Sequence, residues 1–223
     1  AGHHVRVLAC AVQAGACHGL AASALPGAFD AVHDGVPITL LPRAALPVTA
    51  DYSFDIAPVW VDPLQSWMQE QRFDMLHLLH PMRMATAIKA AQQCGLPYVL
   101  TLTDFFLPCN RINLVNLRGQ QCDGPQQGQR CAKDCKVPPW DAESLAQRHR
   151  QAAAVLASAS VCVAPSAYVA DRYRAAFDGL QVQVIPHGID LLALLRHAAS
   201  PAMPPAGARP LTLGYSGTIV PQK

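Results

Sequence analysis

Charged residues are scarce in this sequence of 223 residues: Asp, Glu, Lys and Arg make up 14%, where about a quarter is usual. The formal net charge is only +2, and no basic stretch alternates with aromatic residues. Both absences speak against a nucleic-acid-binding protein, whose phosphate contacts need concentrated positive charge. So little charge is also sparse for a fully exposed surface, and it suits a chain that another domain partly covers.

Three further features are missing from the sequence. No apolar run reaches the length of a membrane-spanning helix, and no secretory signal peptide opens the chain. No glycine-rich first turn with an acidic residue downstream marks a dinucleotide site, which speaks against an NAD-dependent oxidoreductase. Because the chain shows neither a signal peptide nor a membrane-spanning run, we expect a cytoplasmic protein. The first residues look like the middle of a helix-to-strand turn, so we expect the natural N-terminus to lie upstream.

Strand and helix signals alternate along the chain. Apolar runs predict strands at residues 5–11, 35–41, 73–79, 98–102, 161–164 and 182–185. Helical spacing and caps predict helices at residues 61–71, 84–94, 140–158 and 166–177. This alternation indicates an α/β fold, a Rossmann-like parallel sheet with helices on both faces.

The composition changes near the end of the chain. Residues 198–210 are rich in Pro and Ala, which is typical of a linker between domains. We expect one Rossmann-like domain over residues 1–197, and the first strand and turn of a truncated second domain over residues 211–223.

Polar side chains stand at the ends of the predicted strands, where ligands gather in α/β proteins. His80 follows the third strand and Asp104 the fourth. His77 shares a strand with His80, and the period of two places them on opposite faces, so we favour His80 for the cleft. A turn-capping or core-edge role stays open for His80 and Asp104. His187 and Gly188, in the turn VIPHGID, are expected at the same cleft.

A quartet of cysteines falls in residues 103–139, a stretch without clear periodicity that we call the cysteine loop: Cys109, Cys122, Cys131 and Cys135. Thiolates bind zinc tetrahedrally, and such a site can fold a loop that has no core of its own. Four thiolates leave no open position, so the zinc would be structural. Two disulfides, an iron–sulfur cluster or four unrelated thiols remain alternatives.

The last residues, LTLGYSGTIVPQK, combine an apolar run with a turn of small residues and a lysine. Backbone amides at Gly217 and Thr218 can approach an anion closely, and Lys223 adds a compact positive charge. A tight turn with a solvated lysine is the alternative interpretation.

Several of these stretches together resemble the group-1 (family four-type) glycosyltransferases. They are FDMLHLLHP, GLPYVLTLTDFFLPC, CDGP, APS at residues 164–166, VIPHGID and LGYSGTIVPQK. The resemblance is good over residues 73–223 and only in outline before them. It implies a two-Rossmann (GT-B) enzyme that transfers a sugar from a nucleotide-diphosphate donor to an acceptor, with retention at the anomeric carbon.

The resemblance also implies roles for parts of this chain. The N-terminal domain would bind the acceptor, a glycan or a lipid-linked molecule, and His80 and Asp104 would serve as catalytic residues in the cleft. Gly217, Thr218 and Lys223 would face the phosphates of the nucleotide-sugar donor, where positive charge stabilises the leaving diphosphate.

The sequence departs from the family pattern at three points. Thr218 stands where an Arg is frequent, Thr103 stands where a His often precedes the Asp, and the paired glutamates of the family would lie beyond Lys223. We therefore expect this chain to be inactive by itself. A non-catalytic sugar- or nucleotide-binding module stays open as the alternative, and so does peripheral association with a membrane surface.

Overall fold

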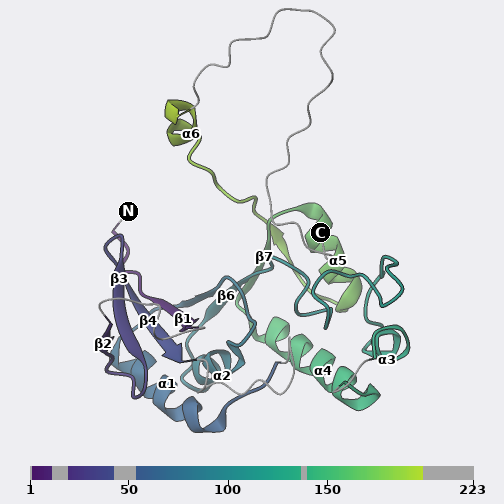
Figure 1. Ribbon diagram of the computed structural model, residues 1–223, viewed down its shortest axis with the longest axis horizontal. Coiled ribbons are helices and arrows are strands. Elements are labelled where there is room, and N and C mark those ends of the chain that lie inside the picture. Colours follow the sequence, from purple (N-terminus) through teal and green to yellow (C-terminus); the bar gives the residue numbers. More distant parts are fainter. Residues whose placement is uncertain (1, 12–19, 43–53, 137–139, 198–223) are drawn as a thin grey trace, which may run out of the picture. The chain divides into compact units, whose positions relative to one another are not determined.

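The computed structural model describes residues 2–11, 20–42, 54–136 and 140–197 (Figure 1). The chain divides into two compact units, one ending at Ile185 and the other beginning at Pro186. The predicted linker and the strand at residues 211–223 lie outside the described residues, so the proposed domain boundaries stay a prediction. Within the described ranges, no helix is long and apolar enough to cross a membrane.

The larger unit contains a parallel sheet whose strands follow one another in sequence order. The strands are β5 (Leu76–Leu78), β6 (Tyr98–Thr101), β7 (Val161–Ala164) and β8 (Gln183–Val184). The connecting helices are α2 (Ala85–Gln93), α4 (Ala142–Ser158) and α5 (Ala167–Ala176). A parallel pair needs a crossover long enough for such a helix. The expected Rossmann-like α/β fold is thereby confirmed.

Local sequence explains where two of these helices begin. Asp141 caps α4: its Oδ1 accepts a hydrogen bond of 2.7 Å from the Ser144 amide, and the Asp141 amide donates to the Ser144 hydroxyl at 2.9 Å. This reciprocal capping box satisfies amides that lack an intrahelical partner. Ser166 caps α5 in the same sense, accepting a bond of 3.3 Å from the Val169 amide, as the sequence predicted.

The core of the parallel sheet lies between its strands and the helices that follow them. Tyr98 and Leu100 of β6 are fully buried with Leu156 of α4 and Ala170 of α5. Burying a side chain of leucine size stabilises the fold by roughly 1.5–3 kcal/mol. This core holds the carboxyl ends of β5 and β6 in place.

The larger unit also contains a second, mixed sheet, of which the sequence predicted two strands, β1 and β4. Its strands, in spatial order, are β1 (Val7–Ala11), β4 (Val36–Pro42), β3 (Phe29–His33) and β2 (Ala21–Ala22). β1 and β4 are parallel, whereas β3 is antiparallel to both of its neighbours. β2 and β3 were not predicted from the sequence, whose pattern indicated parallel strands only.

The missed hairpin has a clear local cause. Asp34 and Gly35 join β3 to β4 with φ angles of 50° and 78°, and His33 pairs with Val36 on either side of them. Two central residues with positive φ make a type I′ turn, whose twist matches that of the flanking strands, and Asp-Gly is a preferred pair for it. The signal was therefore present in the sequence.

Helix α1 (Pro58–Glu70) packs with α2 in a second core that also takes in the mixed sheet. Leu64 and Trp67 of α1 are buried with Ala87 of α2 and Leu41 of β4. Proline is tolerated at the first position of α1, where an amide would lack a helical partner in any case.

Two short helices complete the described elements. α3 (Gln129–Asp134) lies inside the cysteine loop, where the sequence showed no period because six residues are too few for one. α6 (Leu191–His197) belongs to the second unit, and Leu191, Leu192 and Leu195 on it are exposed.

Candidate functional site

The register of the parallel sheet brings two polar strand ends together. Leu78 of β5 pairs with Leu100 of β6, so the two strands end side by side. His80 follows β5 by two residues, and Asp104 follows β6 by three. The carboxyl edge of a parallel sheet is where α/β proteins bind ligands. The two residues are thus placed where the sequence analysis expected a site.

His80 and Asp104 meet in a direct hydrogen bond. His80 Nε2 lies 2.6 Å from Asp104 Oδ2, and the two side chains are 36% and 32% exposed. Both side chains are therefore held by the protein yet remain reachable from solvent. The ring of Phe106 lies next to the imidazole, tilted by 45°, with 5.7 Å between ring centroids.

The neighbouring backbone decides which nitrogen of His80 carries the proton in the neutral ring. The amide of Met82 donates a hydrogen bond of 3.2 Å to His80 Nδ1, so Nδ1 is the acceptor. Nε2 must then carry the hydrogen and donate it to the Asp104 carboxylate. Both ring nitrogens form hydrogen bonds within the protein, so His80 orients the carboxylate of Asp104.

Asp104 is kept ionised by its hydrogen bonds. Burial is the largest single influence on its pKa and raises it, but the bonds from His80 and from the Phe106 amide together prevail and lower the pKa. The Phe106 amide donates to Asp104 Oδ1 at 2.8 Å. Hydrogen bonds to the charged form favour that form. At neutral pH the site therefore presents a carboxylate.

Two more contacts tie the strand ends to their surroundings. The hydroxyl of Tyr173, on α5, donates a bond of 2.8 Å to the Asp104 carbonyl. The hydroxyl of Thr103 donates to the Leu79 carbonyl at 3.2 Å, which links the turns after β5 and β6. Thr103, a position at which the sequence departs from the pattern expected by resemblance, thus has a structural partner.

This arrangement suits the binding of a ligand that donates hydrogen bonds. Each carboxylate oxygen of Asp104 accepts one bond from the protein and keeps capacity for another. A half-exposed carboxylate with fixed orientation can accept a bond from a hydroxyl group, as in a sugar. His80 and the Phe106 amide orient that carboxylate in advance.

The remaining candidate residues stay predictions, and His77, which the sequence placed on the opposite face from His80, has a partner of its own. His77 is exposed and its Nε2 lies 2.8 Å from Thr101 Oγ1, away from Asp104. His187 and Gly188 are exposed and belong to the second unit. The predicted donor-phosphate residues Gly217, Thr218 and Lys223 lie outside the described residues.

Arg148 is a buried cation that was not predicted from the sequence. It contacts the backbone that follows Asp104. Its guanidinium, on α4, donates to the Leu107 carbonyl at 2.9 Å and also to the Phe106 carbonyl. It lies over the Phe106 ring at 4.8 Å from the centroid. Burial lowers the pKa of Arg148 to about 10, and the Cys109 and Cys131 thiols partly offset this. The sequence signal was weak, because an Arg within an amphipathic helix is normally exposed.

The four cysteines of the cysteine loop come close to one another. Cys109, Cys131 and Cys135 are buried and Cys122 is half-buried, all with free thiols. Burial raises the pKa of Cys131 to about 12, and its three partners in the quartet add to the rise. Among the described residues, however, no three His, Cys, Asp or Glu side chains already stand in a geometry that could hold a metal ion.

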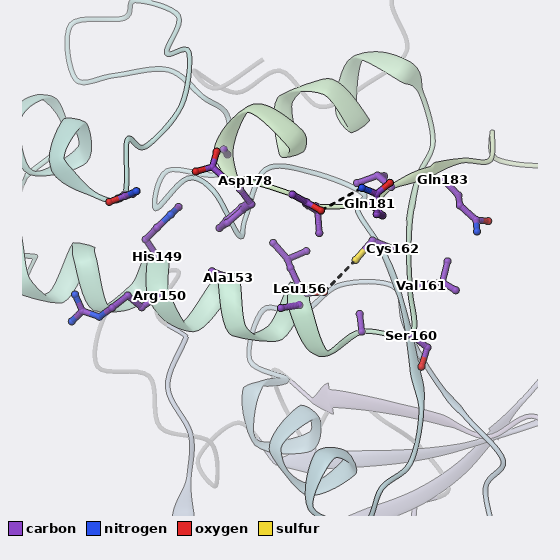
Figure 2. A pocket seen from close by; sticks show the side chains of 18 residues that line it. His149, Arg150, Ala153, Leu156, Ser160, Val161, Cys162, Asp178, Gln181 and Gln183 are labelled. Atoms are coloured by element: carbon purple, nitrogen blue, oxygen red, sulfur yellow. Dashed lines mark hydrogen bonds between the residues drawn. The ribbon is translucent and has the colours of Figure 1, made fainter.

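A pocket of about 890 Å³ lies elsewhere on the parallel sheet. It is lined by the second half of α4, by the chain entering β7 and by residues 176–183 before and within β8. Figure 2 shows His149 and Asp178 towards one end and Ser160 and Gln183 towards the other. The pocket lies at the amino ends of β7 and β8, which begin at Val161 and Gln183. It is therefore separate from the His80–Asp104 pair, which lies at the carboxyl edge of the sheet.

Comparison with known proteins gives one finding. A family model described as "Glycosyl transferase 4-like domain" matches residues 1–188, which include β1 to β8 and both members of the His80–Asp104 pair. No curated protein matches the chain. The resemblance noted from the sequence motifs is confirmed, and the chain belongs to the family of glycosyl transferase 4-like domains.

Proposed function

We propose that this chain is the acceptor-side domain of a retaining glycosyltransferase that uses a nucleotide-diphosphate sugar. The family supports transfer of a glycosyl group in general. The observation that carries the finer proposal is the His80–Asp104 pair, a carboxylate held at the carboxyl edge of a parallel sheet. Ligands of α/β folds bind at that edge.

In this proposal Asp104 accepts a hydrogen bond from a sugar hydroxyl at the reacting centre. His80 fixes the direction of the carboxylate through Nε2, and the Met82 amide fixes His80. Positioning of this kind contributes to rate because the reacting groups need not search for their geometry. Asp104 is therefore the residue in contact with substrate, and His80 is its positioning residue.

The remaining parts of the proposal come from the sequence motifs. Gly217, Thr218 and Lys223 contact the donor phosphates, and His187 and Gly188 line the cleft. The acceptor is a glycan or a lipid-linked glycan, met in the cytoplasm at the membrane surface. Lys223 offsets the charge that grows on the leaving diphosphate.

The test uses the protein produced from its complete gene, incubated with a panel of nucleotide-diphosphate sugars and candidate acceptors. We expect transfer from one donor class, with the anomeric configuration kept in the product as read by NMR. The Asp104→Asn variant should lose kcat/KM by roughly 10²-fold or more, because an amide cannot replace a charged acceptor. His77→Ala changes a histidine on β5 whose ring contacts Thr101, and it should change kcat/KM little.

Two results would contradict the proposal. Binding of a nucleotide sugar by folded protein without any turnover would favour the non-catalytic binding module instead. Equal losses of kcat/KM in the Asp104 and His77 variants would show that the pair has no special part in the reaction.

A further inference from the structure

The cysteine loop is long, yet little regular structure supports it. Between β6 and α4 the described residues contain the six-residue helix α3 and one isolated bridge, Val115 with Gln121. Loops of this length in compact domains are usually functional or held by something other than a core. The four cysteines of the quartet are spread over this loop.

The fold draws these four thiols into one neighbourhood. Cys131 and Cys135 stand one turn apart on α3, so they share a helix face. An ion pair of 3.4 Å between Arg130 and Asp123 joins the residues next to Cys131 and Cys122. The Cys122 amide donates a hydrogen bond of 2.7 Å to the carbonyl of Leu114, five residues after Cys109. Because Cys109 and Cys135 are 26 positions apart in the sequence, only the path of the loop brings them together.

Backbone amides point at two of the sulfur atoms. The Arg111 amide donates to Cys109 Sγ at 3.4 Å, and the Gly124 amide donates to Cys122 Sγ at 3.4 Å. In each case the donor is two residues after the cysteine. Hydrogen bonds to sulfur stabilise a thiolate and tune a metal bound to it.

A buried positive charge stands beside the quartet. Arg148 on α4 interacts electrostatically with Cys109 and Cys131, and its fork is held by the Phe106 and Leu107 carbonyls just before Cys109. α3 and α4 meet closely, because a Cβ on Gly128 would lie 2.9 Å from the Ala146 backbone. The positive charge of Arg148 lowers the pKa of Cys131, although burial and the neighbouring thiols outweigh it in the protein without metal.

We propose that Cys109, Cys122, Cys131 and Cys135 together bind one zinc ion, which fixes the cysteine loop behind the His80–Asp104 pair. Zinc prefers four tetrahedral thiolates in a structural site. Binding replaces four S–H bonds by four Zn–S bonds and releases four protons to solvent. The zinc–tetrathiolate unit carries a net charge of minus two, which Arg148 partly offsets. Among the described residues no three such side chains stand in a metal-binding geometry, so the proposal includes a movement of the four thiols towards one another on binding.

This site does not depend on the proposed transferase activity. Its link to the site is structural. Four residues separate Asp104 from Cys109: Phe105, then Phe106 and Leu107, whose carbonyls accept hydrogen bonds from Arg148, and Pro108. The ion would hold the start of the cysteine loop, and with it the backbone that donates to Asp104.

The test measures metal in protein purified without a histidine tag under reducing conditions. We expect one zinc per chain by elemental analysis, and a cobalt-substituted protein with the absorption bands of tetrahedral thiolate coordination. Cys131→Ser should lose the metal and the cobalt spectrum. Cys94→Ser, a half-buried cysteine outside the cysteine loop, should keep both.

Because Cys131→Ser could fail to fold, wild-type protein provides a second measurement. A zinc chelator should lower its melting temperature, and added zinc should restore it, since an ion bound only by the folded state stabilises that state. Zinc far below one equivalent per chain would overturn the proposal. So would stoichiometric iron, an intact mass lowered by disulfide formation, or a Cys94 variant that loses metal as the Cys131 variant does.

Discussion

Tyr173 on α5 reaches across the core to donate a hydrogen bond of 2.8 Å to the carbonyl of Asp104, 69 residues away in the sequence. The ring of Tyr173 is buried and stacks near Phe105 and Phe177. Burial raises the pKa of Tyr173 well above its usual range, so the hydroxyl remains a donor at any physiological pH. The bond therefore connects the helix α5 to the backbone of the candidate site.

Tyr173→Phe removes this donor, together with the hydroxyl oxygen that interacts with the Leu107 backbone, and leaves the aromatic ring in place. We expect a loss of about 1–2 kcal/mol in the free energy of unfolding, because the partly buried Asp104 carbonyl loses a partner. Urea unfolding measures it. Tyr168→Phe is the matched control. Tyr168 is exposed on the same helix and its hydroxyl accepts a bond from Gln121, so the stability of this variant should be nearly that of wild type. Equal losses in both variants would show that the Tyr173 bond has no special weight.

The ionised Asp104 predicts a dependence of stability on pH. A carboxyl whose folded pKa lies below its unfolded value, about 3.9, contributes stability above that value. The contribution is lost as the pH falls through the folded pKa. We therefore expect Asp104→Asn to be less stable than wild type at pH 7, with the difference shrinking below about pH 4.

Denaturant unfolding at several pH values tests this expectation. Asp74→Asn, at an exposed carboxylate before β5, serves as the control and should not show the same narrowing. The difference in the free energy of unfolding between wild type and the Asp104 variant should be smaller in acid. If it is as large there as at neutral pH, the hydrogen bonds do not stabilise the ionised form of Asp104.

Arg148→Met should cost about 3 kcal/mol of stability or more, because two carbonyls lose a charged donor in a buried place. Arg148→Lys should recover only part of the loss, since an ammonium group lacks the planar fork. Thermal unfolding provides the measurement. Arg150→Met is the control, as Arg150 pairs with Glu143 while both side chains are more than half exposed, and such pairs contribute about 0–1 kcal/mol.

Gly128→Ala should destabilise the protein through both backbone strain and steric contact. Gly128 has a φ of +90°, and an added Cβ would lie 2.9 Å from the backbone N and Cα of Ala146. Gly119→Ala isolates the strain alone, because Gly119 has a φ of +75° with nothing within 4 Å of a Cβ.

We expect Gly119→Ala to cost roughly 1–2 kcal/mol, the penalty of a left-handed conformation. Gly128→Ala should cost more, measured by urea unfolding. If the two variants are equally stable, the close approach of α3 to α4 does not hold in solution, and the packing of the cysteine loop on α4 would need revision.

The local parts of the fold could be predicted because their causes lie within a few residues. Ser166 caps α5 where expected, and β7 has the predicted bounds of residues 161–164. The strand ends that carry His80 and Asp104 were recognised because a strand followed by polar residues is a local pattern. The Asp34–Gly35 turn was equally local, and a search for that pair would have predicted the β3–β4 hairpin.

The sequence by itself determined the alternation of strands and helices, the family and the residue types available for chemistry. Only the tertiary structure decided that His80 Nε2 meets Asp104 and that Arg148 is buried behind the cysteine loop. The physical reason is that these contacts join residues 24 or about 40 positions apart. Such contacts depend on the register of parallel strands and on how helices pack over them, and no local pattern of residues encodes either.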